Sequence, residues 1–211
     1  MNGAQIERFF RENPDLADDY RGDGFWERRA IAARYLSQRR LREMLNDPDE
    51  VVRRVLAYRL PVEELITLID DPDREVRITV ADRIELKHLE YLAEDPDYLV
   101  RQYVSRRLPP GRLFRMMIDS DRAVRKTVAQ RLPVETLMLM SRDADAEVRQ
   151  IVAERVPPTQ ATAFLHDEEW LVRLTAATRV PFERLAAILE DEDPDVRAVA
   201  RERWNEHHGS E

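Results

Sequence analysis

A repeat with a period of 24 residues runs through most of the chain and constrains its fold more than any other feature. An aspartate recurs at that interval from residue 23 to residue 191. If this aspartate is position 1 of each repeat, position 7 is arginine in all eight repeats and position 13 is arginine in seven. A period of this length indicates stacked, similar repeats that contact their neighbours, rather than one central core.

Each repeat is predicted to hold two helical segments. An aspartate at position 1 or 3 suits the N-cap of a helix, and the pattern leaves open which of them is the cap. Apolar residues at positions 6, 9, 10 and 14 mark one face of a helix of about ten residues, which the proline at position 15 ends, as in Leu60-Pro61. Positions 16 to 23 form a second, shorter segment, for which a short α-helix and a 3₁₀ helix both fit.

The pattern DPDxxVRxxVAxRLPxExL appears in the repeats that begin at Asp71 and Asp119, with Val76-Arg77 in the first and Arg131-Leu132-Pro133 in the second. It resembles the leucine-rich repeat variant family, whose members stack alternating α and 3₁₀ helices into a right-handed superhelix. The resemblance implies an all-α fold, a right-handed, HEAT-like α-solenoid of about eight 24-residue repeats. The expected parts are an N-terminal capping segment (1–22), a degenerate first repeat (23–46), six full repeats (47–190) and a truncated C-terminal repeat with a polar tail (191–211).

Composition removes most catalytic chemistry from consideration. Some members of the family carry an N-terminal four-iron, four-sulfur cluster held by cysteines, but this sequence has no cysteine and is expected to lack the cluster. The five glycines match no phosphate-binding loop, and the four histidines share no metal-ligand spacing. No apolar run is long enough to cross a membrane. We therefore expect a cytoplasmic, bacterial-type protein that is not an enzyme and has no cofactor, metal or membrane association.

The repeated charges balance one another. The chain has 34 Lys and Arg against 42 Asp and Glu, a net charge of −8. Positions 1 and 3 supply fifteen acids, and positions 7 and 13 supply fifteen arginines. Arginine suits bidentate pairing with a carboxylate, so a structural ladder is predicted between aspartates and position-7 arginines of the same or neighbouring repeats. Its predicted members are Asp47, Arg53, Asp71, Arg77, Asp95, Arg101, Asp119, Arg125, Asp143, Arg149, Asp167 and Arg173.

The position-13 arginines allow two interpretations. They lie near the C-terminal end of the predicted helix, where a cation can donate to the last carbonyls. Alternatively, they form a cationic row on the concave wall that binds a polyanion. The residues of this row are Arg59, Arg83, Arg107, Arg131, Arg155 and Arg179, followed by Arg203.

Outward positions that should be polar carry large apolar side chains in two repeats. Trp170, Leu171 and Leu174 stand at positions 4, 5 and 8 of one repeat, and Tyr98 and Leu99 at positions 4 and 5 of another. An exposed cluster with a tryptophan is typical of a partner site, although packing against a terminal segment is an alternative. We further expect the aromatic residues Phe9, Phe10, Phe25 and Trp26 to close the N-terminal end of the core, and Trp204 the C-terminal end.

These observations favour a monomeric scaffold or adaptor that binds a protein partner, of unknown identity, through its concave face or the Trp170 cluster. The alternative is nucleic-acid or polyanion binding through the position-13 row, which the negative net charge disfavours.

Overall fold

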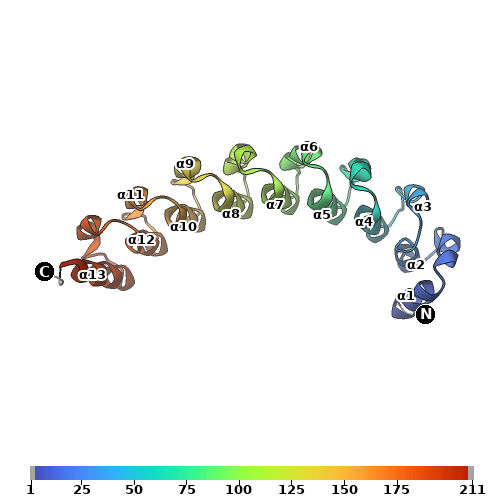
Figure 1. Cartoon of the computed structure of the whole chain (residues 1–211), viewed down its shortest axis with the longest axis horizontal. Helices are drawn as coiled ribbons and strands as arrows, with labels where there is room; N and C mark the ends of the chain where they lie inside the picture. The colour runs from blue at the N-terminus through green and yellow to red at the C-terminus, as the bar shows by residue number, and fades with distance from the viewer. Residues whose placement is uncertain (1–2, 209–211) are drawn as a thin grey trace. The chain divides into compact units, whose positions relative to one another are not determined.

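The computed structural model describes residues 3–208. Every regular element among them is helical, and the all-α solenoid predicted from the repeat is confirmed. Two compact units, Met1–Leu108 and Pro109–Glu211, divide the chain. In each unit, the long helices form one layer and the shorter segments form the other (Figure 1).

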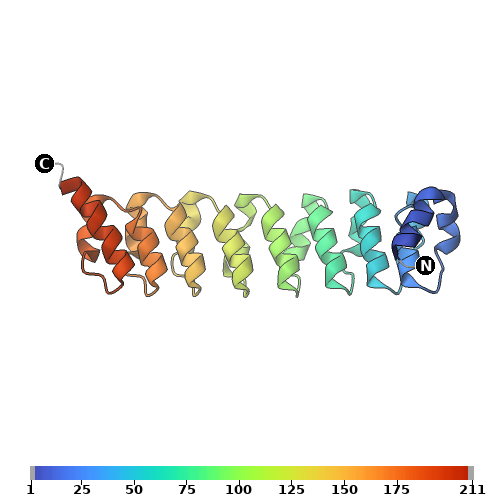
Figure 2. The ribbon, with the colours of Figure 1, turned by 90° about the horizontal axis from the view of Figure 1, so that it is seen from below.

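The first unit begins with two elements that precede the repeats. Its helices are α1 (Gly3–Glu12), η1 (Pro14–Tyr20), α2 (Trp26–Ala32), α3 (Gln38–Arg42), α4 (Glu50–Arg59), η2 (Val62–Leu68), α5 (Arg74–Arg83), α6 (Leu86–Leu89), η3 (Glu90–Glu94) and α7 (Tyr98–Arg107). Helices α1, α2, α4, α5 and α7 pack against one another in that order, so they lie side by side (Figure 2).

The second unit continues the same alternation. Its helices are η4 (Pro110–Arg112), η5 (Phe114–Ile118), α8 (Arg122–Arg131), α9 (Val134–Leu137), η6 (Met138–Met140), α10 (Ala146–Arg155), α11 (Pro158–Ala161), η7 (Thr162–Phe164), α12 (Trp170–Ala177), η8 (Phe182–Ile188) and α13 (Pro194–His208). Helices α8, α10, α12 and α13 pack successively along the long-helix layer.

Helices α4, α5, α7, α8 and α10 span positions 4 to 13, and the residue at position 14 is extended. Helices α2 and α12 are shorter and end at Ala32 and Ala177. Three of the shorter segments start with four α-helical residues and finish as 3₁₀, so both forms that the sequence allowed are present. The core lies between the two layers. In the repeat that begins at residue 47, it contains Val52, Leu56 and Leu60 from the long-helix half and Leu65 and Leu68 from η2, each at most 3% exposed.

The expected aromatic cap of the N-terminal end is only partly correct. Phe10 is fully buried and makes an edge-to-face contact with Tyr20, with ring centroids 4.9 Å apart. Phe25 is 66% exposed and Trp26 is 42% exposed, so neither closes the core. The reason is their register: Phe25 occupies the N-cap position of α2 and Trp26 is the first residue of that helix, both outside the apolar stripe.

At the C-terminal end, part of the expected polar tail is helical, and residues 209–211 lie outside the described residues. Helix α13 continues as far as His208, and the His207 ring stacks on Phe182 with ring centroids 3.4 Å apart. Trp204 is half-buried on the same helix. The truncated repeat therefore forms a longer final helix that packs on η8.

Candidate functional site

Position-7 arginines pair with the aspartate that opens the next repeat, as Arg53 and Asp71 do. Arg53 donates from Nε and Nη2 to the two carboxylate oxygens of Asp71 at 2.7 and 3.0 Å. Its Nη1 donates to the carbonyl of Asp47, in its own repeat, at 2.8 Å. The same bidentate pairing is found in Arg29–Asp47, Arg77–Asp95, Arg125–Asp143, Arg149–Asp167 and Arg173–Asp191.

The remaining two predicted members of the ladder hold the same local positions. Arg101 donates from Nη1 to the carbonyl of Asp95 at 2.8 Å. Asp119 accepts the N–H of Asp121 at 2.8 Å. Arg53 makes the equivalent bond to the carbonyl of Asp47, and Asp71 accepts the equivalent N–H, that of Asp73.

The two aspartates of a repeat have different roles, which settles the question of the N-cap. Asp73, at position 3, is the N-cap of α5 and accepts the N–H groups of Glu75 and Val76. Asp71, at position 1, accepts Arg53 and the N–H of Asp73. In the repeat that begins at residue 167, Glu169 stands at position 3 with similar backbone angles, but its side chain makes no cap hydrogen bond.

The ladder is largely buried, which leaves it little exposed to other ligands. The side chains of Asp71 and Arg53 are only 3% and 11% exposed. The hydrogen bond to Asp71 raises the pKa of Arg53 above its ordinary value, although burial acts in the opposite direction. Burial alone would raise the pKa of Asp167, but hydrogen bonds from Arg149 and from the N–H of Glu169 lower that pKa below its ordinary value. The hydrogen bond to Asp167 likewise raises the pKa of Arg149, so both partners of that rung stay charged and paired.

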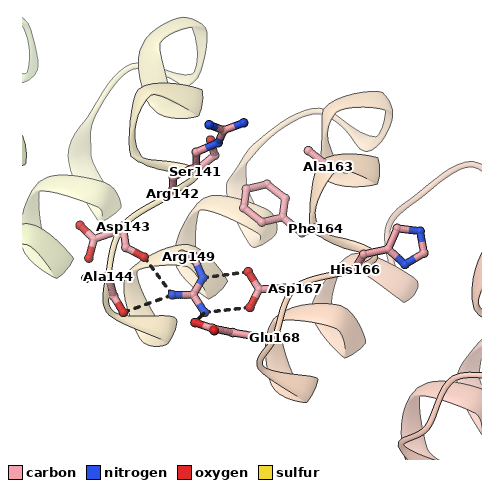
Figure 3. A pocket seen from close by; sticks show the side chains of 10 residues that line it. All are labelled: Ser141, Arg142, Asp143, Ala144, Arg149, Ala163, Phe164, His166, Asp167 and Glu168. Carbon is pink, nitrogen blue, oxygen red and sulfur yellow. Dashed lines mark hydrogen bonds and ion pairs between the residues drawn. The ribbon is translucent and has the colours of Figure 1, made fainter.

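An open groove of about 450 Å³ adjoins the Arg149 rung of the ladder. Figure 3 shows the Arg149 guanidinium between Asp167, Glu168 and the carbonyls of Asp143 and Ala144, at distances of 2.8 to 3.2 Å. All three of its nitrogens already donate to oxygen atoms of the protein. The groove therefore presents a cation that is already bound rather than an anion site.

The position-13 arginines bind the preceding repeat through its backbone. Arg83 donates to the carbonyls of Ala57 and Leu60, and Arg155 donates to those of Ala129 and Leu132. Proline at position 15 explains the first of these contacts, because Pro61 has no N–H to donate to the position-11 carbonyl of Ala57. The arginine of the next repeat thus completes the end of the preceding helix.

The other members of the position-13 row have the same environment where their contacts are described. Arg59 donates to the carbonyls of Ala33, Arg34 and Leu36, and Arg107 to that of Ala81. Arg179 donates to the carbonyl of Val156. All of the row, Arg131 included, is half-buried. The row therefore caps helix C-termini, as one interpretation proposed, but those of the preceding repeat rather than of the same helix.

The Trp170 cluster lies at the beginning of α12 in the long-helix layer. Trp170 and Leu171 are 37% and 39% exposed, and Leu174, one turn later, is half-buried. Figure 2 shows α12 between α10 and α13, and both of these helices pack on it. Gln150 of α10 reaches Thr175 of α12 at 3.2 Å, so the surfaces of the two helices are continuous.

Acidic side chains border this cluster on both neighbouring helices. Leu171 stands at position 5, where α10 carries Glu147 and α13 carries Asp195. At position 12, Glu154 and Glu202 occupy the same two helices. Lys126 and Arg122 pair with Glu147, whereas the other three acids make no ion pair within the described part of the chain. The result is an apolar centre with an acidic border.

In the first unit, the predicted Tyr98 and Leu99 begin α7, with Tyr98 41% exposed and Leu99 half-buried. Trp26, which the sequence assigned to the N-terminal cap, is instead 42% exposed and occupies the same position 4 at the start of α2. The interval is three repeats from Trp26 to Tyr98 and again three repeats from Tyr98 to Trp170. That regular spacing was available in the sequence and would have separated Trp26 from the core aromatics.

Two further features are absent from the described residues. Among residues 3–208, no group of three or more His, Asp or Glu side chains is arranged to hold a metal ion. Within the same range, no helix is both long and apolar enough to span a bilayer.

Comparison with known proteins places these features in a family. Residues 122–145 match the family model described as leucine rich repeat variant. A solved structure titled "a leucine-rich repeat variant with a novel repetitive protein structural motif" is 54% identical, with a TM-score of 0.92, and the match covers 96% of this chain and 86% of that chain.

A curated relative matches over a much shorter segment. An uncharacterized 27.7 kDa protein from the nifB 3′ region of Rhodobacter capsulatus is 47% identical over 57 residues. That match covers 27% of this chain and spans only 23% of the relative. The extended structural match, together with the repeated Asp–Arg ladder, shows that this chain belongs to the leucine-rich repeat variant family.

Proposed function

We propose that this protein is a non-enzymatic scaffold of bacterial, cytoplasmic type that binds a basic, amphipathic segment of a protein partner. The observation that carries the proposal is the Trp170 cluster in the long-helix layer of the second unit. The cluster exposes a tryptophan and a leucine where the repeat pattern favours polar residues.

The repeated charges are poorly suited to binding, since they already hold the repeats together. The ladder arginines are engaged by carboxylates, and position-13 arginines donate to backbone carbonyls of the preceding repeat. A ligand would have to displace these contacts to use either row. Binding is therefore better served by side chains that depart from the repeat.

The border of the cluster indicates the chemistry of the partner. Asp195 is exposed at the same repeat position as Leu171, and Glu154 and Glu202 are exposed about two helical turns further along the flanking helices. Leucine-like side chains of a partner would bury the apolar centre, while lysine or arginine side chains would face these acids. A cationic group can also stack on the Trp170 ring. A basic amphipathic helix combines both features.

The test uses a fluorescently labelled amphipathic peptide of about 14 residues, or four helical turns, made of lysine and leucine (the KL peptide). We expect Trp170→Ser/Leu171→Ser to weaken its binding roughly 30-fold, the effect of losing a hot spot of about 2 kcal/mol. This variant keeps the net charge of the protein. A loss of affinity for the KL peptide would therefore come from the missing apolar side chains and not from weaker attraction between opposite charges.

The matched control is Arg74→Ser/Glu75→Ser, at positions 4 and 5 of α5, which also leaves the net charge unchanged. Circular dichroism spectra establish that both variants remain folded. Equal affinity of the Trp170→Ser/Leu171→Ser variant and the wild type for the KL peptide would refute the proposal.

A further inference from the structure

The short-helix layer of the second unit carries a second unusual surface. Ile118, at the end of η5, is 87% exposed, and Leu139, in η6, is 67% exposed. They have the highest exposure of the large apolar side chains in the part of the chain that the structure describes. Two such side chains on a polar surface indicate a site that a partner covers.

Ile118 and Leu139 occupy positions that are neighbours between successive repeats. Leu139 is at position 21 and Ile118 at position 24 of the preceding repeat. In the first unit, the same two positions are occupied by Tyr91 and Asp70, whose side chains form a hydrogen bond of 3.1 Å. The second unit thus replaces a polar contact between repeats with an apolar pair.

Two arginines flank the apolar pair. Arg115 lies one 3₁₀ turn before Ile118 in η5, and Arg142 follows Leu139 by three residues. Both are exposed, and neither forms an ion pair or a side-chain hydrogen bond with another residue in the range 3–208. We call Arg115, Ile118, Leu139 and Arg142 the short-helix strip. Asp119 and Asp143 directly follow Ile118 and Arg142, but both are half-buried, and Asp143 is held by Arg125. The exposed Glu135 lies at the start of α9.

At positions 21 and 24, arginine occurs in the second unit and not in the first. In the first unit, positions 21 and 24 hold Glu43 and Asn46, Thr67 and Asp70, and Tyr91 and Glu94. The protein as a whole has a net charge of −8, so two unpaired arginines beside exposed isoleucine and leucine run against its general composition. The charge and the apolar pair occur together, as expected of one recognition surface.

We propose that the short-helix strip binds an acidic, amphipathic segment of a protein, distinct from the basic segment proposed for the Trp170 cluster. Apolar side chains of the segment cover Ile118 and Leu139, and its carboxylates pair with Arg115 and Arg142, which are suited to bidentate contact. The second unit then has two docking faces of opposite charge, one in each layer.

The size of the strip favours a protein segment over other anionic partners. Recognition of an anionic membrane surface usually needs clusters of about four to eight basic residues, and the strip has two. Nucleic-acid binding draws its affinity from many phosphate contacts, which a protein of this net charge disfavours. A short segment needs only a small apolar centre and a few charge pairs.

The experiment compares the KL peptide with the EL peptide, in which glutamate replaces every lysine. At low ionic strength, we expect the EL peptide to bind the full chain and to lose at least about ten-fold in affinity with Ile118→Ser/Leu139→Ser. Arg115→Gln/Arg142→Gln should weaken binding and reduce its dependence on salt. Trp170→Ser/Leu171→Ser should leave EL binding unchanged, so the two proposals can fail separately.

Tyr91→Ser is the matched control, because it removes an exposed aromatic side chain from position 21 of the first unit and should not affect the EL peptide. The proposal is overturned if the EL peptide does not bind, or if it binds the Ile118→Ser/Leu139→Ser variant as tightly as the wild type. It is also overturned if those substitutions abolish self-association seen by sedimentation equilibrium, or binding to phosphatidylglycerol vesicles, instead of EL binding.

Discussion

Replacing Asp71 with alanine tests the energetic importance of the ladder. The substitution removes both carboxylate oxygens that Arg53 binds at 2.7 and 3.0 Å, and the acceptor for the N–H of Asp73. Arg53 keeps its bond to the carbonyl of Asp47 but loses its counter-charge at a site where its side chain is 11% exposed. Breaking a buried pair in this way lowers the free energy of unfolding by about 3 to 5 kcal/mol. Because the Arg53 side chain keeps some contact with solvent, we expect a loss of about 3 kcal/mol.

The assay is urea unfolding followed by far-UV circular dichroism. The slope of the transition has to be compared between variants, because stacked repeats can unfold in parts. A double-mutant cycle with Arg53→Met separates the pair from its surroundings. The double variant should be less destabilised than the sum of the two single variants, with a coupling of about 2 kcal/mol, since neither charge is then left unpaired.

A more exposed arginine–carboxylate pair, Arg42–Glu64, serves as a control. Arg42 donates to both carboxylate oxygens of Glu64, at 2.7 and 2.5 Å, but their side chains are 49% and 27% exposed. Glu64→Ala should therefore leave the urea midpoint unchanged within error. A destabilisation by Asp71→Ala as small as that of Glu64→Ala would refute the view that the buried ladder holds the repeats together.

Three further predictions concern the ends of helices and pH. Arg155→Ala should lower the free energy of unfolding by about 1 to 3 kcal/mol in urea titrations, because the carbonyls of Ala129 and Leu132 lose their donor; stability unchanged from wild type would contradict the capping role. Glu169→Asp should raise stability by about 0.5 to 1 kcal/mol, since an aspartate at this N-cap can accept the N–H of Leu171 as Asp49 accepts that of Val51; the reverse substitution Asp145→Glu should lower the thermal midpoint. The pKa of Asp191 is lower in the fold, where burial alone would raise it but Arg173 and the N–H of Asp193 outweigh that effect. The charged Asp191 side chain therefore contributes to the free energy of unfolding above about pH 4, and this contribution is lost as the pH falls further. On acidification, the urea midpoint of Asp191→Asn should drop less than that of the wild type.

The sequence predicted the helical segments well because they depend on a repeated local pattern. Apolar spacing and proline at position 15 defined the long helices, and the core residues Val52, Leu56 and Leu60 are buried as that pattern requires. The choice between Asp71 and Asp73 as N-cap could not be made from the pattern, because both are aspartates two residues apart. Only the folded chain shows that Asp71 turns toward Arg53 of the preceding repeat.

Predictions about the candidate surfaces were less complete for a related reason. The acceptors of Arg83 and Arg155 are backbone carbonyls, which no side-chain pattern records. Trp26 and Phe25 were assigned to the core by composition, although their places at the start of α2 direct them outward. The short-helix strip was not recognised, since Ile118 and Leu139 come together only when successive repeats stack.

The central claim is that the repeated charges hold the stack and that binding belongs to residues that depart from the repeat. Hydrogen–deuterium exchange of the full chain, with and without the KL peptide, tests this most directly. We expect peptide-induced protection to centre on α12, around residues 170–178, with the other long helices little changed. Protection distributed over the helix ends that carry the position-13 arginines, with none at α12, would contradict the account.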